Sequence, residues 1–353
     1  MRALVTTPGV PHSVAVAEVA APERRADRVL LRPLEVGVCG TDREIVEGRF
    51  GSPPVGEPFL VLGHELLAEV ADDGHGFARG DLVTATVRRS CARCGACAAG
   101  APDACATGDY AERGITRLHG FAAELVAEDP AQLVAVPASL GRLGVLAEPA
   151  SVCERALRHV RAIGARQPWA AERALVLGTG AIGILTTFLL RLDGYEVWTA
   201  GRTPAGDGEK AALVSAVGAR YVSVRETPPR ALADDVGGFD VVVEAAGEAQ
   251  TMLDAISLLR RNGVACLLGL DGRDQRVELD GRVIGVDAVL GNRAVFGSVN
   301  AHRVDWEAAV GHLDAIRARW PEALEAVVGR HVPLDAYPDA FAYRGVKATL
   351  ALG

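Results

Sequence analysis

Short hydrophobic runs, interrupted by glycine, proline and aspartate, follow one another along residues 1–150. They read MRALVTT (1–7), RVLLRPLEVGVC (28–39), LLAEVAD (66–72), DLVTATV (81–87) and AELVAED (123–129). Runs of this length between turn-forming residues are typical of short strands. The pattern therefore predicts a mostly antiparallel or barrel-like domain.

After Pro149 the pattern changes to an alternation of apolar strands and amphipathic helices. The expected strands are 173–178, 195–201, 220–224, 239–247 and 263–269, and the expected helices are 181–192, one from about 208, and 251–261. Fully apolar strands between such helices indicate a parallel sheet covered on both faces, which is a doubly wound domain. This domain is expected to end near RAVFGSVN, residues 293–300. The roughly 50 residues that follow are too few for a core of their own, so we expect them to pack onto the first domain.

The length of 353 residues favours two domains, which we place at 1–150 with 297–353, and at 151–296. A content of 49% hydrophobic and 23% charged residues is that of a folded protein. The formal charge of -8 argues against nucleic acid or an anionic membrane as a partner and favours a small substrate. The N-terminus has no basic region followed by an apolar stretch, and no window is long and apolar enough to span a bilayer. We therefore expect a cytoplasmic protein.

Four of the seven cysteines, Cys91, Cys94, Cys97 and Cys105, follow the spacing C-x2-C-x2-C-x7-C. Four thiolates on one loop can close a tetrahedron around Zn²⁺ and leave no open position, which defines a structural site. In a chain without an export signal this spacing favours a metal over disulfides. Small buried hydrophobes and an iron–sulfur cluster are the alternatives. The sequence predicts a structural zinc loop at residues 91–105.

The stretch LVLGTGAIGIL places Gly178, Gly180 and Gly183 in a G-x-G-x-x-G motif between a strand and a helix. The first glycine permits a tight turn, the second lets the backbone approach a pyrophosphate, and the third lets helix and strand pack closely. The helix N-terminus attracts the phosphate charge. The motif predicts a dinucleotide site.

The end of the second strand of this domain favours NADP over NAD. An NAD-selective domain usually carries an acidic residue there, which binds the ribose 2′-hydroxyl. This sequence has Gly201, Arg202 and Thr203 instead. The planar guanidinium of Arg202 suits a 2′-phosphate, although a solvated surface arginine is the alternative.

Cys39 in GVCGTD, the pair His64 and Glu65 in VLGHE, and Glu148 in LAEPA each follow apolar residues. A catalytic zinc ion takes three such protein ligands and keeps a fourth position for water or substrate. A cation would also explain why a carboxylate stands at Glu148, where apolar surroundings disfavour its charge. A buried cysteine or histidine alone is more often a core residue. We predict that these residues form a catalytic zinc site.

The other basic partners available to Glu148 are Arg155 and Arg158, about one and two helical turns downstream. We expect both arginines to face outward.

These motifs, together with AERGI, HGF and FGSVNAHR, resemble those of zinc-dependent medium-chain alcohol dehydrogenases over almost the whole chain, and most closely archaeal-type glucose 1-dehydrogenases. The resemblance implies an α/β protein with a GroES-like, mostly-β catalytic domain and a doubly wound Rossmann domain. It implies hydride transfer from C1 of an aldose to NADP, or to NAD, with formation of the lactone. It also implies two zinc ions per chain, one structural and one catalytic.

The resemblance assigns roles to individual positions. Cys39, His64 and Glu148 would surround the catalytic zinc, with Glu65 as a supporting or alternating ligand. Thr41 would relay the hydroxyl proton, with Glu44 as a weaker candidate for the outer end of the relay. The sugar would be bound by Thr41, Glu112, Glu148 and Asn300. The cofactor would be bordered by Gly178, Gly180, Ala181, Ile182, Gly183, Gly201, Arg202, Thr203, Leu268, Gly269, Leu270, Val299 and Asn300.

Two departures from the family pattern leave alternatives open. Some members have an aspartate at the position of Val152, so a polyol, aminosugar or cyclitol dehydrogenase is an alternative. Several have a second arginine at the position of Thr203, so the preference for NADP is expected to be modest. An alternative of another class is a non-catalytic nucleotide-binding scaffold. The apolar stretch 293–300 offers an interface edge, so we expect a homo-oligomer, either a dimer or a tetramer.

Overall fold

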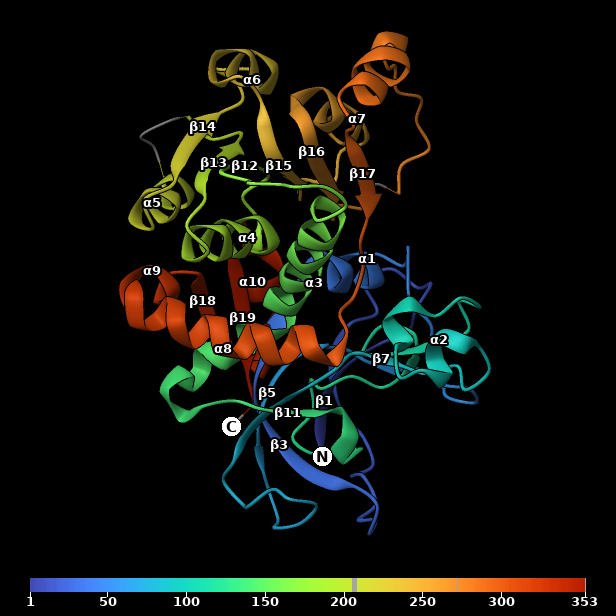
Figure 1. Cartoon of the computed structure of the whole chain (residues 1–353). Coiled ribbons are helices and arrows are strands. Elements are labelled where there is room, and N and C mark those ends of the chain that lie inside the picture. Colours follow the sequence, from blue (N-terminus) through green and yellow to red (C-terminus); the bar gives the residue numbers. More distant parts are fainter. Residues whose placement is uncertain (205–207, 271, 353) are drawn as a thin grey trace. The chain divides into compact units, whose positions relative to one another are not determined.

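The computed structural model describes residues 1–204, 208–270 and 272–352 (Figure 1). The chain forms two compact units. Unit 1 contains residues 1–151, 300–317 and 328–353, and unit 2 contains residues 152–299 and 318–327. The domain limits expected from the sequence stay a prediction beside this division.

Unit 1 is built from short, mostly antiparallel strands. Its sheets have the orders β2-β1-β4, β11-β6-β5-β3-β19-β18 with β10 paired to β3, and β7-β8-β9. The strands are β1 (Arg2–Thr6), β2 (Ala15–Glu18), β3 (Val29–Val38), β4 (Leu60–Val61), β5 (Glu65–Val70), β6 (Leu82–Ala85), β7 (Arg88–Arg89), β8 (Ala111–Arg113), β9 (Arg117–Leu118), β10 (Val126–Glu128), β11 (Leu133–Ala135), β18 (Val328–Pro333) and β19 (Lys347–Ala351). The pairing of β19 with β3 agrees with the expectation that the C-terminal residues pack onto the first domain.

The helices that lie entirely in unit 1 are short. They are α1 (Gly40–Val46), α2 (Gly95–Ala98), η1 (Pro102–Ala104), η2 (Pro130–Gln132), η3 (Ala138–Leu146), η5 (Leu334–Ala336) and α10 (Tyr337–Ala342). Two longer helices, α3 (Ala147–Gly164) and α8 (Arg303–Arg319), begin in unit 1 and end in unit 2.

The register of three neighbouring strands in unit 1 positions its chemical groups. β3 is the central strand, and antiparallel pairing places Gly37 opposite Glu65 of β5 on one side and opposite Thr349 of β19 on the other. The end of β3, the start of β5 and the start of β19 therefore meet at one place in the sheet. Cys39 follows the first of these strand ends, and Lys347 begins the last.

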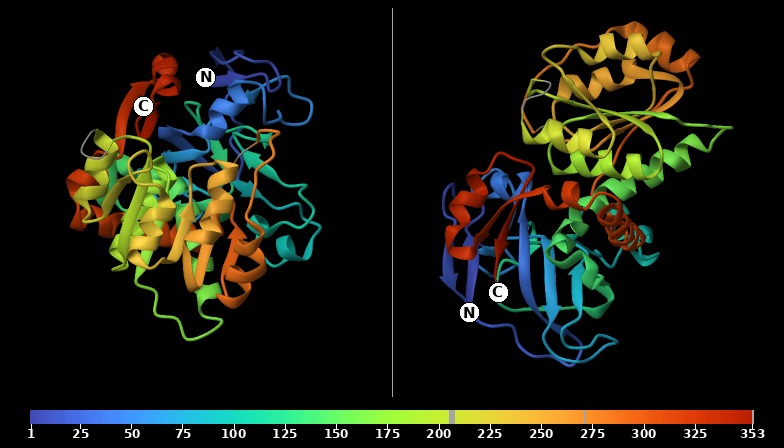
Figure 2. Two further views of the ribbon diagram at one scale, coloured as in Figure 1. Left: turned by 90° about the horizontal axis from the view of Figure 1, so that it is seen from above. Right: turned by 90° about the vertical axis from the view of Figure 1, so that its left-hand side faces the viewer.

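Unit 2 contains a six-stranded sheet in which all strands are parallel, in the order β14-β13-β12-β15-β16-β17. Helices lie on both faces of this sheet (Figure 2). Its elements are β12 (Arg173–Leu177), α4 (Ala181–Leu192), β13 (Glu196–Gly201), α5 (Glu209–Ala216), β14 (Arg220–Ser223), α6 (Pro229–Val236), β15 (Phe239–Glu244), α7 (Ala249–Leu258), β16 (Leu259–Leu267), η4 (Val283–Ala288), β17 (Ala294–Gly297) and α9 (Pro321–Glu325). This is the doubly wound sheet that the strand and helix alternation predicts.

The sheet of unit 2 is stabilised by a continuous apolar core. Trp198 of β13 packs edge-on against Phe239 of β15, with ring centroids 5.4 Å apart, and both are buried. Continuous apolar strands suit a sheet that is buried on both faces. The sequence pattern did not predict α6, nor the short strands β2 and β4, whose runs carry little periodic signal.

Candidate functional site

Cys39 lies between the end of β3 and the start of α1, where it is the N-cap of the helix. The backbone NH of Thr41 donates to the Cys39 sulfur at 3.2 Å. The backbone NH of Cys39 donates in turn to Oδ2 of Asp42 at 2.9 Å. This reciprocal capping fixes the thiol at the start of α1.

His64 precedes β5 and faces Cys39. Its Nε2 lies 3.1 Å from the sulfur of Cys39, and its Nδ1 lies 3.5 Å from Oδ1 of Asp42. A carboxylate behind the imidazole fixes its ring orientation, as is usual for a metal-ligating histidine. Sequence reasoning missed Asp42. The signal for it was its place in the GTD segment, where an acidic residue at the third helical position completes a capping box.

Glu65 is buried beside Lys347, which sequence reasoning also missed. The Lys347 Nζ donates to Oε1 and Oε2 of Glu65 at 2.6 and 2.7 Å, and the lysine is only 2% exposed. A Cβ atom at Gly37 would lie 1.9 Å from Glu65 Oε2, so the opposite strand must carry glycine to leave room for this carboxylate. The position of Lys347 depends on strand register, which no local motif reveals.

Glu148 stands in the first turn of α3. Burial, together with the negative charges of Glu65 and Asp42, raises its pKa to about 7, although His64 and Lys347 oppose the shift. Its charge therefore interacts with those of His64, Glu65, Lys347 and Asp42.

The expectation that Arg155 faces outward is wrong. Arg155 is only 8% exposed, whereas Arg158 is exposed as expected. Arg155 lies near Cys266. Burial and the charge of Cys153 raise the pKa of this thiol to about 12, and the Arg155 guanidinium opposes the shift. Residues 153–157 of α3 are all buried, so every side of the helix is covered there and the charged side chain of Arg155 is enclosed.

The cluster fits a divalent cation. Ligand atoms of Cys39, His64 and Glu65 all lie within 4.8 Å of one another in buried or half-buried surroundings. Burial opposes the protonation of His64, yet the charges of Cys39 and Asp42 raise its pKa well above the ordinary value. An excess of anionic donors around a histidine is the donor set that zinc prefers. Glu148 is not one of the three in the 4.8 Å group, so its assignment as a ligand stays a prediction.

All four residues that the family resemblance assigns to the sugar, Thr41, Glu112, Glu148 and Asn300, lie in unit 1, and two of them are in contact. The side-chain NH2 of Asn300 donates to Oε1 of Glu112 at 3.0 Å, across 188 residues of sequence. Thr41 is two residues from Cys39, at the start of α1.

The four clustered cysteines lie close together at α2 and η1. Their sulfur atoms all lie within 4.8 Å of one another, and those of Cys94 and Cys105 are 4.0 Å apart. A tetrahedron with Zn–S bonds of about 2.3 Å has sulfur atoms separated by about 3.8 Å, so the spacing fits a zinc site. It is too long for a disulfide, in which the sulfurs are about 2.05 Å apart. Hydrogen bonds from Thr107 and the backbone lower the pKa of Cys91 to about 5, which favours the thiolate that a metal requires.

The glycine motif of unit 2 has the geometry of a phosphate-binding turn. Gly178 has a φ of +115°, and a Cβ atom there would lie 2.8 Å from the backbone of Ala245. A Cβ atom at Gly183 would lie 2.1 Å from the carbonyl oxygen of Gly178, so any side chain would separate helix from strand. Gly180 is the N-cap of α4, and a Cβ atom there would have no heavy atom within 4 Å. This open space at the helix N-terminus leaves room for a phosphate group.

A cavity of about 800 Å³ opens beside this turn. Of the residues predicted to border the cofactor, four line it: Gly178, Gly180, Gly201 and Arg202. The others, which do not line it, are Ala181, Ile182, Gly183, Thr203, Leu268, Gly269, Leu270, Val299 and Asn300. Their assignment stays a prediction.

The cavity lining carries positive charge where the second strand ends. Lys210 of α5 lines the cavity with Arg202, and burial and the Arg202 charge lower its pKa while Glu209 opposes the shift. A Cβ atom at Gly201 would lie 2.6 Å from the hydroxyl of Tyr221, so the fold leaves no room for an acidic side chain at this position. Sequence reasoning missed Lys210, although its place in the first turn of the following helix was a usable signal.

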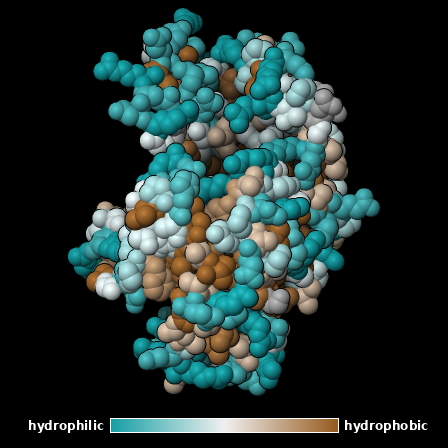
Figure 3. All heavy atoms as spheres, turned by 180° about the vertical axis from the view of Figure 1, so that it is seen from behind, coloured by the Kyte–Doolittle hydropathy of each residue, from teal (hydrophilic) through white to brown (hydrophobic). Residues whose placement is uncertain are grey.

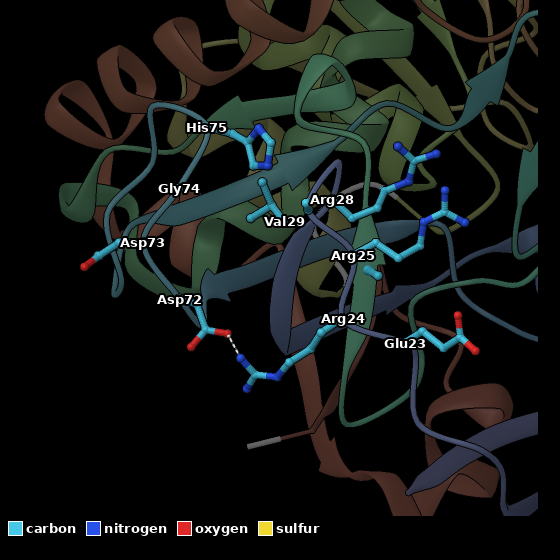
Figure 4. Close-up of a pocket in the computed structure, with 11 residues that line it drawn as sticks. Glu23, Arg24, Arg25, Arg28, Val29, Asp72, Asp73, Gly74 and His75 are labelled. Carbon is cyan, nitrogen blue, oxygen red and sulfur yellow. Dashed lines mark hydrogen bonds and ion pairs between the residues drawn. The ribbon is translucent and has the colours of Figure 1, made fainter.

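A hollow of about 320 Å³ in unit 1 is lined by residues that include Arg24, Arg25 and Arg28 (Figure 4). Arg24 pairs with Asp72 at 2.5 Å, and the other two guanidinium groups pair with Asp27. These charges already have exposed acidic partners, and none of the predicted site residues lines the hollow. We assign no site to it.

The described residues contain no helix with both the length and the apolar composition that crossing a bilayer requires. Hydrophilic residues cover much of the face drawn in Figure 3, and hydrophobic residues show on it as patches between them.

Unit 1 is rich in β-strands and contains a cluster of cysteine, histidine and glutamate and a loop with four cysteines. Unit 2 is a parallel sheet with a dinucleotide-binding turn. This combination defines the class of medium-chain alcohol dehydrogenases. Comparison with known proteins narrows this class. Residues 25–138 match the family model "Alcohol dehydrogenase GroES-like domain", and residues 141–352 match the model "Glucose dehydrogenase C-terminus". The chain therefore belongs to the glucose dehydrogenase family, with the GroES-like and doubly wound architecture expected from its sequence.

Relatives in this family align with almost the entire chain. The glucose 1-dehydrogenase of Methanocella arvoryzae is 41% identical over 339 residues, which cover 95% of this chain and 94% of the relative. That of Thermoproteus tenax is 41% identical over 350 residues, or 97% and 96% of the two chains. The glucose dehydrogenase of Haloferax mediterranei, solved in complex with NADP, Zn and gluconolactone, is 34% identical and superposes with a TM-score of 0.91 over 99% of both chains.

Proposed function

We propose that this protein is a zinc-dependent dehydrogenase that transfers a hydride from C1 of a glucose-like aldose to NADP and releases the lactone. The observation that carries this proposal is the convergence of Cys39, His64 and Glu65 within 4.8 Å in a chain that aligns end to end with glucose dehydrogenases. The Haloferax mediterranei structure with NADP, Zn and gluconolactone supports the same substrate and cofactor.

Cys39 and His64 would hold the catalytic zinc ion, with Glu65 or Glu148 as the carboxylate ligand. A zinc ion bound there would act as a Lewis acid and lower the pKa of the substrate hydroxyl. Asp42 holds the imidazole of His64 in place from the opposite ring nitrogen.

The sugar would be oriented by side chains of unit 1. Glu112 and Asn300 offer a carboxylate and an amide to sugar hydroxyls. Thr41 offers a hydroxyl beside Cys39 that can relay the proton of the reacting hydroxyl, since it accepts one hydrogen bond while it donates its own proton onward to water. Several fixed polar groups are what a polyhydroxylated substrate requires for orientation.

The cofactor would bind in the 800 Å³ cavity of unit 2, with its pyrophosphate at the N-terminus of α4. Arg202 and Lys210 would pair with the 2′-phosphate of NADP. The absence of a carboxylate at Gly201 removes the group that would favour NAD.

The chain would assemble with copies of itself through β17. Among the described residues this strand pairs only with β16, so its other edge is open. Val289 and Leu290, which precede it, are 67% and 63% exposed. An open edge strand next to exposed apolar side chains favours pairing with a second copy. Analytical ultracentrifugation tests this, because Val289→Asp should shift an oligomer toward monomer.

The experiment that tests the function is NADP reduction by the zinc-loaded protein with a panel of aldoses and polyols. Oxidation of D-glucose or a related aldopyranose is the expected result. Val152 has no oxygen for a sugar hydroxyl, so oxidation of polyols alone would instead assign a polyol dehydrogenase. Turnover of no member of the panel by protein holding both zinc ions would contradict the proposal and favour a non-catalytic scaffold.

A further inference from the structure

Arg88 of β7 is a buried arginine whose guanidinium joins three segments of unit 1. It is 5% exposed. Its Nε donates to Oε1 of Glu112 at 2.9 Å, and its Nη1 donates to the carbonyl oxygen of Asp103 at 3.1 Å. The ring of Tyr110 lies 3.7 Å below the guanidinium. The group is therefore held by a carboxylate, a carbonyl and an aromatic face at once.

The contacts of Glu112 leave one of its oxygens for a ligand. Oε1 accepts from both Arg88 and the amide NH2 of Asn300, at 2.9 and 3.0 Å. Among the residues described in the structure, none donates to Oε2. The carboxylate is thus fixed through one oxygen while the other stays available to accept from a hydroxyl.

Asn300 is equally constrained. Its Oδ1 accepts from the backbone NH of Ala301 at 2.7 Å, and one hydrogen of its NH2 goes to Glu112. One amide hydrogen remains for a ligand. Glu112 and Asn300 together therefore present one acceptor and one donor in a fixed relation.

The four-cysteine loop supports both of these residues. Asp103, whose carbonyl binds Arg88, lies in η1 between Cys97 and Cys105. Independently, the carbonyl oxygen of Gly100 lies 3.1 Å from Nε2 of His302, two residues after Asn300. The segments that carry Glu112 and Asn300 are thus tied to the same loop.

We propose that Arg88 is a positioning residue for sugar binding, which fixes the Glu112 carboxylate and links its orientation to the cysteine loop at 91–105. This inference rests on the proposed function, in which Glu112 binds a sugar hydroxyl. The planar fork of arginine holds the carboxylate and the carbonyl in a fixed relation, and the single ammonium group of lysine cannot reproduce it. Arg88 does not touch the reacting atoms. It acts through Glu112.

The test compares Arg88→Lys with Arg89→Lys in the full-length, zinc-loaded protein. Arg89 is the matched control, because it is the next residue of β7 and its guanidinium binds Glu128 instead of Glu112. We expect Arg88→Lys to raise the KM for glucose at least tenfold, with kcat within threefold of wild type, the KM for NADP unchanged and both zinc ions retained. Arg89→Lys should leave the KM for glucose unchanged. The dissociation constant of gluconolactone, measured by calorimetry in the presence of NADP, should rise with the KM.

A double-mutant comparison separates positioning from a purely structural role. If Arg88 acts through Glu112, the pair Arg88→Gln with Glu112→Gln should have the same KM for glucose as Glu112→Gln alone. This pair removes both buried charges together, so it also serves if Arg88→Lys fails to fold. The inference would be overturned if the KM for glucose in the double variant rose by the product of the rises in Arg88→Gln and Glu112→Gln. It would also be overturned by an unchanged KM for glucose in Arg88→Lys, or by an equal rise of this KM in Arg89→Lys. Failure of the proposed function is recognised separately, because wild-type protein would then neither oxidise an aldopyranose nor bind gluconolactone.

Discussion

Replacing Lys347 by Met would test whether Glu65 faces a metal ion. The substitution removes the ammonium group that donates to both oxygens of this buried carboxylate, at 2.6 and 2.7 Å. In zinc-free protein, His64 is a group beside this carboxylate that can still carry a positive charge, because its pKa is raised well above the ordinary value. In zinc-loaded protein the same carboxylate can turn toward the ion beside Cys39 and His64. The cost of losing the lysine should therefore depend on the metal.

The magnitude follows from the burial of the pair. Both side chains are only 2% exposed, so solvent screening does not reduce the interaction. Breaking a buried ion pair from one side costs about 3–5 kcal/mol. In a unit of this size about 1 kcal/mol lowers Tm by about 2–4 °C, so zinc-free Lys347→Met should melt about 6–20 °C below zinc-free wild type. In the zinc-loaded pair of proteins we expect at most half of that loss.

Thermal unfolding followed by circular dichroism, with and without chelator, measures both differences. Lys347→Arg keeps a cation and is the conservative control. Combining Lys347→Met with Glu65→Gln removes both charges and should restore most of the lost stability. Equal losses of Tm with and without zinc would show that Glu65 does not respond to the ion and would refute the reasoning.

Three further predictions concern other parts of the molecule. Arg202→Ala should raise the KM for NADP in steady-state assays at least tenfold, which corresponds to about 1.4 kcal/mol, and should hardly change the KM for NAD. Equal effects on the two cofactors would exclude a contact between Arg202 and the 2′-phosphate. Cys97→Ser should lower the zinc content measured by mass spectrometry from two ions per chain to one and lower Tm, because the four-cysteine site contributes folding energy. Burial opposes the charge of Glu128, but Arg113 and Arg89 lower the pKa of this carboxyl below the ordinary value of 4.5. The charged carboxylate therefore stabilises the fold above about pH 4.5, and this stabilisation is lost as the pH falls through the folded-state pKa. Glu128→Gln should therefore cost about 3 kcal/mol in denaturant unfolding at pH 7 and less near pH 3, and a cost that does not change with pH would contradict this.

The parts of the site that depend on local sequence were predictable. The four cysteines lie on one short loop, at residues 91–105, and the three glycines lie on one turn, at residues 178–183. Each group is close in sequence, and the structure brings the residues of each group together. Cys39 and His64 were also assigned to one predicted zinc site, because each follows an apolar run at a turn. Their 3.1 Å contact comes from the pairing of β3 with β5, which follows from two adjacent strands of compatible pattern.

The parts that depend on register or on distant segments were not predictable from the residues. The bond between Glu112 and Asn300 joins segments 188 residues apart, and only the family resemblance suggested it. Lys347 reaches Glu65 because β19 pairs with β3 at one register, and a lysine at the start of an apolar strand carries no sign of that. The error at Arg155 has the same origin, since helical periodicity does not reveal how much of a helix is enclosed.

The central claim is that a hydride leaves C1 of the sugar for NADP with the aid of a zinc ion at Cys39 and His64. Its most direct measurement uses D-glucose labelled with deuterium at C1 and mass spectrometry of the reduced cofactor. With zinc-loaded protein, the account predicts one deuterium in each NADPH formed and a slower rate than with unlabelled glucose, and it predicts no reduction after zinc is removed. Reduced cofactor without deuterium, or unchanged turnover by zinc-free protein, would contradict it.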